Sequence, residues 1–181
     1  MERQQIERHL FRLVSVVRNA ACHCSLSKYT GSFEQNYWIL IFNNFLDMAV
    51  LEWCKVFGSH GEPTHWKNLV DDHTSFRTGL LRRLELDEDK WEAYWKDMKE
   101  YRDYQIAHYK KPPNLTNYPS LDIALEASYY YYEWIIQKLR SLGHSGYPDN
   151  LQDYYESFLT QALKFSENAY DSTKSLGEEV Y

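Results

Sequence analysis

The fold class of this chain is decided by a pattern that is clearest near its start, in Ile6-Glu7-Arg8-His9-Leu10-Phe11-Arg12-Leu13-Val14-Ser15-Val16-Val17. Apolar residues recur there three and four positions apart, which is the spacing of one face of an α-helix. Arginines occupy the other face. We therefore expect an amphipathic helix that ends around Lys28, before the turn-forming Tyr29-Thr30-Gly31.

The same spacing continues along the chain, and no segment alternates as a β-strand does. A second helix is expected to start with Ser32 as its cap and to end before Gly58; because it is apolar on several sides, it should lie at the centre of the bundle. Asp87 and Ser120 are expected to cap later helices. The sequence thus predicts an all-α, single-domain bundle of about six helices over residues 1–170 and a polar, frayed tail over 171–181. The further helical segments are a turn at 66–70 and helices over 75–84, 90–109, 120–142 and 151–170.

The net charge and the distribution of apolar residues limit the partners and the cell compartment expected of this chain. A net charge of -6 excludes a generally basic surface for nucleic acid, so any such contact has to be local. The N-terminus has no apolar core of the signal-peptide kind, and the most apolar stretch, residues 37–45, is interrupted by two asparagines and is too short to span a membrane. We expect a cytoplasmic protein with reduced thiols and no membrane partner.

Two clusters contain the residue types that bind metals, but neither has the usual spacing. In Cys22-His23-Cys24 the cysteines are closer than in structural zinc sites, so small buried core thiols are the preferred interpretation. His60, His65 and His73 flank two aspartates, yet the glycine and proline among them favour a flexible surface loop. No metal site is predicted.

Four consecutive tyrosines, Tyr129 to Tyr132, are followed by Trp134. Consecutive residues point all round a helix, so some of these rings are expected to face a partner or solvent. Aromatic side chains are common both in subunit interfaces and in base-stacking platforms. The interface is the preferred interpretation.

The segment most informative about function is Arg102-Asp103-Tyr104-Gln105-Ile106-Ala107-His108. In a regular helix, positions six apart lie roughly 120° from each other around the axis. Arg102 and His108 can therefore converge only if the helix end unwinds or a second subunit contributes. The run Lys110-Lys111-Pro112-Pro113 ends the helix and favours a loosened last turn.

This segment resembles the motif of the HEPN superfamily of small helical proteins, in which an arginine, usually followed by a polar residue, precedes a histidine by four to six positions. Arg102, Asp103 and His108 fit that pattern, and Ile106-Ala107-His108 is similar to the branch associated with abortive infection. A looser resemblance extends through residues 51–58 and His65-Trp66.

The resemblance implies a metal-independent ribonuclease that needs no cofactor and acts as a homodimer, with two motifs facing each other. His108 would transfer the proton when a 2′-hydroxyl attacks its neighbouring phosphate, Arg102 would stabilise the developing charge, and Asp103 would orient one of them. Tyr109, Lys110 and Lys111, directly after the motif, are predicted to bind substrate. Lys110 stands where several family toxins have a tyrosine. The predicted setting is phage defence or a toxin and antitoxin pair, with an antitoxin protein as partner.

Two further interpretations of the motif stay open. A folded family member can carry it in a structural or inactive form, or Arg102 can simply pair with Glu100 or Asp97 on the helix surface. A different class of function, a non-enzymatic helical module whose aromatic surface binds another protein, is the alternative to an RNA-cleaving or RNA-binding protein.

Overall fold

The computed structural model of this protein describes residues 2–107 and 118–177. Six α-helices and no β-strand lie within these residues, which confirms the predicted all-α bundle. Short 3-10 turns occur at Thr30–Ser32 and Trp66–Asn68, and a π-helical segment covers Arg102–Ala107. The α-helices are α1 (Glu2–Ser27), α2 (Asn36–Phe57), α3 (His73–Leu84), α4 (Glu88–Tyr101), α5 (Asp122–Ser141) and α6 (Leu151–Thr173).

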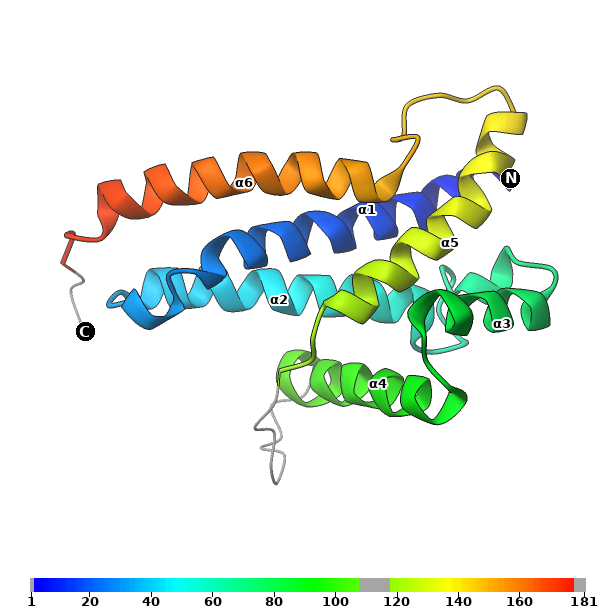
Figure 1. Cartoon of the computed structure of the whole chain (residues 1–181), viewed down its shortest axis with the longest axis horizontal. Coiled ribbons are helices and arrows are strands. Elements are labelled where there is room, and N and C mark those ends of the chain that lie inside the picture. The colour runs from blue at the N-terminus through cyan, green and yellow to red at the C-terminus, as the bar shows by residue number, and fades with distance from the viewer. Residues whose placement is uncertain (1, 108–117, 178–181) are drawn as a thin grey trace.

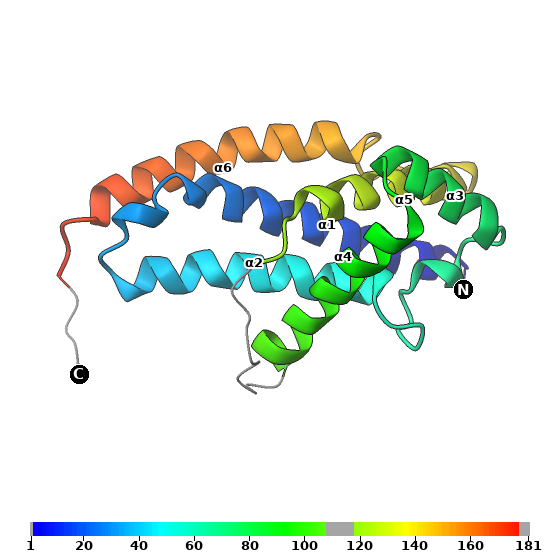
Figure 2. The same cartoon turned by 60° about the horizontal axis from the view of Figure 1, so that its bottom comes forward.

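Helices α1, α2 and α6 lie side by side along the long axis of the molecule, and both views show this arrangement (Figures 1 and 2). Helix α1 packs against α2, α6 and α5. Helix α3 packs on α5, and α4 with its π-helical extension packs on α2. Half of the molecule is therefore a three-helix arm, and the other half is a thicker body that holds α3, α4 and α5.

The body contains the main core. The predicted apolar stripe of α1 is fully buried there, and the second half of α2 contributes Val50, Trp53 and Val56. The arm has a smaller aromatic cluster around Leu26, Trp38 and Tyr170.

Only half of α2 lies at the centre of the bundle, so the prediction for the whole helix was wrong. Its first half belongs to the arm, where two neighbouring helices cannot cover all of its apolar faces. Tyr37 and Leu40 are consequently exposed. The helix also begins later than predicted: Ser32 closes a separate 3-10 turn, and Gln35 is the cap position of α2.

The predicted helix boundaries hold at some ends and shift at others. The Asp87 carboxylate accepts a hydrogen bond from the Lys90 amide at 2.8 Å, as expected of a cap. The cap position of α5 is Leu121 instead of Ser120, whose hydroxyl accepts from the Asp122 amide at 3.2 Å. Helix α6 continues to Thr173, beyond the predicted start of the tail. The Gln35 side chain then donates to the carbonyl of Lys174 at 2.6 Å.

The tyrosine run of α5 lies largely in the core of this chain. Tyr129, Tyr131 and Tyr132 are buried because α5 packs against α1, α3 and α6 on different sides. Tyr130 is half-buried over Gly79 of α3. Three of the four tyrosines are therefore unavailable to a partner, whereas Tyr130 and Trp134 keep exposed surface, so an interface at this run stays a prediction.

The cysteines differ from one another in burial. Cys54 is a buried core thiol, but Cys22 is half-buried and Cys24 is exposed, so the interpretation of that pair as buried thiols was wrong for Cys24. None of the described helices has the length and apolar character needed to cross a bilayer.

Candidate functional site

The arginine motif begins where the α-helical geometry of α4 ends. Tyr101 is the last residue of α4, and Arg102–Ala107 form the π-helical segment. A π-helical turn is wider than an α-helical one, and such segments often occur at functional sites. The predicted departure from regular helix geometry is thus present at the motif itself.

Arg102 is held by its neighbour in the motif. Its Nε and Nη2 atoms lie 2.8 Å and 2.6 Å from Oδ1 of Asp103. Glu100 instead pairs with Lys96 at 3.7 Å, so the alternative in which Arg102 pairs with Glu100 was wrong. Asp103 therefore holds the guanidinium, whereas the catalytic role that the family resemblance implies for it stays a prediction.

The surroundings of Arg102 limit its access to solvent. Its side chain is only 17% exposed, whereas that of Asp103 is 46% exposed. On the preceding turn, buried Tyr101 donates a hydrogen bond to Asp47 of α2 at 2.7 Å. Burial raises the pKa of the Cys54 thiol to about 12, and the positive charge of Arg102 opposes that rise, which places Arg102 beside α2. The guanidinium thus lies at the junction of α4 and α2.

The other predicted site residues, His108, Tyr109, Lys110 and Lys111, lie outside the described residues. The convergence of Arg102 with His108 therefore stays a prediction.

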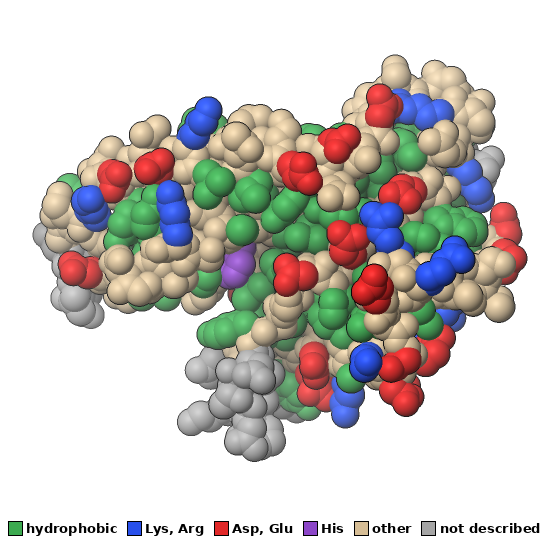
Figure 3. Space-filling view, viewed as in Figure 1, with side chains coloured by type: hydrophobic (Ala, Val, Ile, Leu, Met, Phe, Trp, Pro, Cys, Tyr) green, Lys and Arg blue, Asp and Glu red, His purple; other side chains and the backbone are tan. Residues whose placement is uncertain are grey.

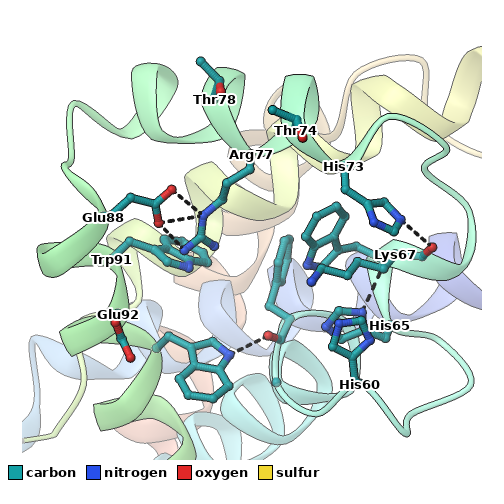
Figure 4. A pocket seen from close by; sticks show the side chains of 14 residues that line it. His60, His65, Lys67, His73, Thr74, Arg77, Thr78, Glu88, Trp91 and Glu92 are labelled. Atoms are coloured by element: carbon teal, nitrogen blue, oxygen red, sulfur yellow. Dashed lines mark hydrogen bonds and ion pairs between the residues drawn. The ribbon is translucent and has the colours of Figure 1, made fainter.

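A second candidate site is a cavity of about 510 Å³ between the end of α2, the connection to α3, and helices α3 and α4. Phe57, Gly58, His65 and Trp66, which belong to the looser part of the family resemblance, line it. Figure 4 shows the histidines and Lys67 on one side of the cavity and Glu88, Trp91 and Glu92 on the other.

The histidines of this cavity are more ordered than a flexible surface loop would make them. His65 is only 3% exposed and stacks on His60, with 4.5 Å between the ring centroids. The exposed His73 ring donates through Nε2 to the Lys67 carbonyl at 3.1 Å. Within the part of the chain that the structure describes, no group of three or more histidines, cysteines or carboxylates is arranged to hold a metal ion.

The opposite wall combines charged and aromatic side chains. Arg77 of α3 pairs with Glu88 of α4 at 2.7 Å and lies over the Trp91 ring, 5.1 Å from its centroid. The indole N–H of Trp95 donates to the Phe57 carbonyl at 2.7 Å. These contacts fix the orientation of α4 against α3 and the end of α2.

The sequence offered one unused signal for this cavity. Along α4, Glu88, Glu92, Trp95, Lys99 and Arg102 follow one another at intervals of three and four, so they share a helix face. Trp95 and Arg102 lie about 10 Å apart along the axis at the usual helical rise, so the cavity and the motif are neighbours.

Charges do not gather by sign on the face of the molecule drawn in Figure 3, where acidic and basic side chains are interspersed. Comparison of the chain with protein-family models, with curated proteins and with solved structures found no match. The functional argument therefore depends on the motif and on the geometry around it.

Proposed function

We propose that this chain is a HEPN-like protein that binds or cleaves RNA in the cytoplasm through Arg102, Asp103 and His108, in phage defence or as the toxin of a toxin and antitoxin pair. The observation that carries the proposal is the coincidence of the motif with a π-helical segment, in which Asp103 holds the Arg102 guanidinium. A guanidinium oriented in this way can bind a phosphate through its remaining N–H donors.

In the proposed reaction, His108 takes the proton of a 2′-hydroxyl while that oxygen attacks the adjacent phosphorus. The bond from phosphorus to the 5′-oxygen breaks, which leaves a 2′,3′-cyclic phosphate and a 5′-hydroxyl that takes its proton from water. Arg102 stabilises the negative charge that develops on the phosphate oxygens. A histidine suits this role because its ordinary pKa lies near neutral pH. The proposal requires no metal and no cofactor. It includes a homodimer, because the family resemblance implies two motifs that face each other.

The test is cleavage of a mixed RNA substrate in the presence of EDTA by the purified parent protein and by Arg102→Ala and His108→Ala. Arg83→Ala is the matched control, because it removes another arginine that has a carboxylate partner, Glu126 at 3.1 Å, away from the motif. Circular dichroism and thermal unfolding establish that each variant is folded.

Cleavage by the parent and by Arg83→Ala that both motif variants lose supports the proposal. No cleavage at micromolar protein, or equal cleavage by all four proteins, removes catalysis by the motif in the isolated chain. Binding of uncleaved RNA that Arg102→Ala alone weakens would leave RNA binding as the function.

One observation favours the alternative, a non-enzymatic protein-interaction module. Large apolar side chains are exposed along the arm, among them Leu40 of α2 and Phe165 of α6. Exposed apolar surface of this kind marks protein interaction sites. Sedimentation of the parent and of Leu40→Asp and Phe165→Asp separates the two functions: an arm that makes the dimer yields monomers in these variants, whereas an arm that binds another protein leaves the mass unchanged.

A further inference from the structure

The cavity between α3 and α4 has two chemically different sides (Figure 4). The first side consists of His60, His65, Lys67 and His73, and the second of Glu92 with two tryptophans of α4. A cavity of about 510 Å³ lies within the size range of small-molecule sites, which is roughly 300–1,000 Å³. The residues that the RNA proposal uses do not line it.

His65 supplies a fixed hydrogen-bond donor on the first side. Its Nδ1 accepts from the backbone N–H of Lys67 at 3.3 Å, so the proton of the neutral ring sits on Nε2. Burial, together with the electrostatic effect of the neighbouring His60 and Lys67, lowers the pKa of His65 to about 4. The ring is therefore neutral at pH 7, and its Nε2–H has no hydrogen-bond partner among the described residues.

The charges around His65 define what this donor can bind. After burial, the groups that act on its pKa are all cationic or histidine side chains: His60, Lys67, His9 and His73. Of these groups Lys67 carries a positive charge at neutral pH, and a hydrogen-bond donor beside a positive charge favours an anionic oxygen. The Lys67 ammonium lies 5.4 Å from the centroid of the Trp66 ring and remains half-exposed, so it can reach an anion at the cavity mouth.

The second side suits a flat ring. Trp91 and Trp95 line it. Trp91 is only 3% exposed and Arg77 lies over its ring, so the half-buried Trp95, held by its hydrogen bond to the Phe57 carbonyl, supplies the accessible aromatic surface. The Glu92 side chain is exposed and has no ion-pair or hydrogen-bond partner in the described part of the chain, whereas Glu88 is paired with Arg77. A free carboxylate beside aromatic rings can accept hydrogen bonds from the N–H groups of a heterocycle.

We propose that this cavity binds a small ligand that carries a planar nitrogen heterocycle and an anionic group, either a phosphate or a carboxylate. The anionic group lies at His65 and Lys67, and the ring lies against Trp95 with its N–H toward Glu92. The proposal goes beyond the RNA function of the motif and requires neither Arg102 nor His108.

Isothermal titration calorimetry of the full chain tests this with four probes. Adenosine monophosphate and orotate each combine an anion with a nitrogen heterocycle that carries N–H groups, and they distinguish the phosphate from the carboxylate. Adenosine and inorganic phosphate supply the halves of the first probe. We expect at least one combined probe to bind with a Kd below about 1 mM, and adenosine and phosphate to bind roughly tenfold more weakly or not at all.

Two variants locate the binding. Lys67→Ala removes the ammonium and keeps the backbone N–H that orients His65, and Glu92→Gln removes only the charge of the free carboxylate. Each should weaken the combined probe roughly tenfold, whereas Lys164→Ala, an exposed lysine of α6, should leave its affinity unchanged. The proposal is overturned if neither combined probe binds, if adenosine or phosphate binds equally well, or if both cavity variants bind like the parent.

Discussion

The two buried histidines predict how the stability of this protein depends on pH. Burial lowers the pKa of both His9 and His65 from 6.5 to about 4. His9 is enclosed in the core with its Nδ1 2.7 Å from the Tyr131 hydroxyl, and His65 closes the wall of the cavity. Between pH 6.5 and pH 4 the unfolded chain therefore binds protons at these two positions that the folded chain does not bind. Linkage requires the free energy of unfolding to fall as the pH falls through this window.

The size of the effect follows from the pKa difference. At pH 5 a histidine in the unfolded chain is almost fully protonated, whereas these two histidines in the folded chain are mostly neutral. Each of them therefore lowers the free energy of unfolding by about 1.36 kcal/mol for each pH unit below 6.5, which is about 2 kcal/mol over the 1.5 units to pH 5. The two together should lower the free energy of unfolding by about 4 kcal/mol between pH 7.5 and pH 5. Their contribution does not change between pH 7.5 and pH 8.5, where both the folded and the unfolded forms are neutral.

Urea denaturation at pH 7.5 and pH 5.0 measures this change in the free energy of unfolding, and the variant His65→Gln identifies the half that comes from His65. Glutamine has an oxygen that can accept the Lys67 amide but does not titrate, so the variant should lose about 2 kcal/mol of the pH dependence, whatever its absolute stability. The free energy of unfolding should fall less in the variant than in the parent between the two pH values. The reasoning for His65 is refuted if the two falls differ by less than about 0.5 kcal/mol.

Other contacts give predictions that can be checked by simpler measurements. Arg12→Ala should lower the free energy of unfolding, measured in urea, by about 3 kcal/mol, because it removes the guanidinium that lies 2.9 Å from the buried Glu52 carboxylate. A loss below about 1 kcal/mol would show that the Lys55 ammonium, 2.7 Å from the same carboxylate, is a sufficient partner alone. Gly79→Ala should cost about 1–3 kcal/mol because the added methyl overlaps the Tyr130 hydroxyl, and Tyr130→Phe in the same chain should recover part of that loss. Cys54, whose burial raises its thiol pKa to about 12, should resist iodoacetamide at pH 8 until urea unfolds the chain, as mass spectrometry of the alkylated peptides can show.

The helices themselves could be predicted because their causes are local. Apolar spacing, Asp87 at a cap position and Gly58 after the last residue of α2 all act within a few residues of one another. The prediction was weaker where a neighbour decides the outcome. The start of α2 depends on Gln35, whose side chain reaches the far end of α6, and sequence spacing says nothing about that contact.

The two candidate sites also differ in whether adjacent residues or the packing of distant segments form them. The arginine motif is visible in the sequence because Arg102 and Asp103 are adjacent, and their pairing needs no other part of the fold. The cavity brings together side chains from four segments, and only the packing of α4 and α3 beside the end of α2 makes His65, Arg77 and Glu92 neighbours. Its histidines were noticed in the sequence, but the burial of His65 was not.

The sequence by itself determined that this chain is helical, where most helices lie and which face of α1 enters the core, because backbone hydrogen bonds and amphipathic spacing are local properties. Tertiary structure alone decided which apolar faces are covered. Three of the four tyrosines of α5 are buried because three helices surround that helix, whereas the first half of α2 buries Trp38 and leaves Tyr37 and Leu40 exposed. Burial is a property of the assembled bundle, so an apolar segment can remain partly at the surface.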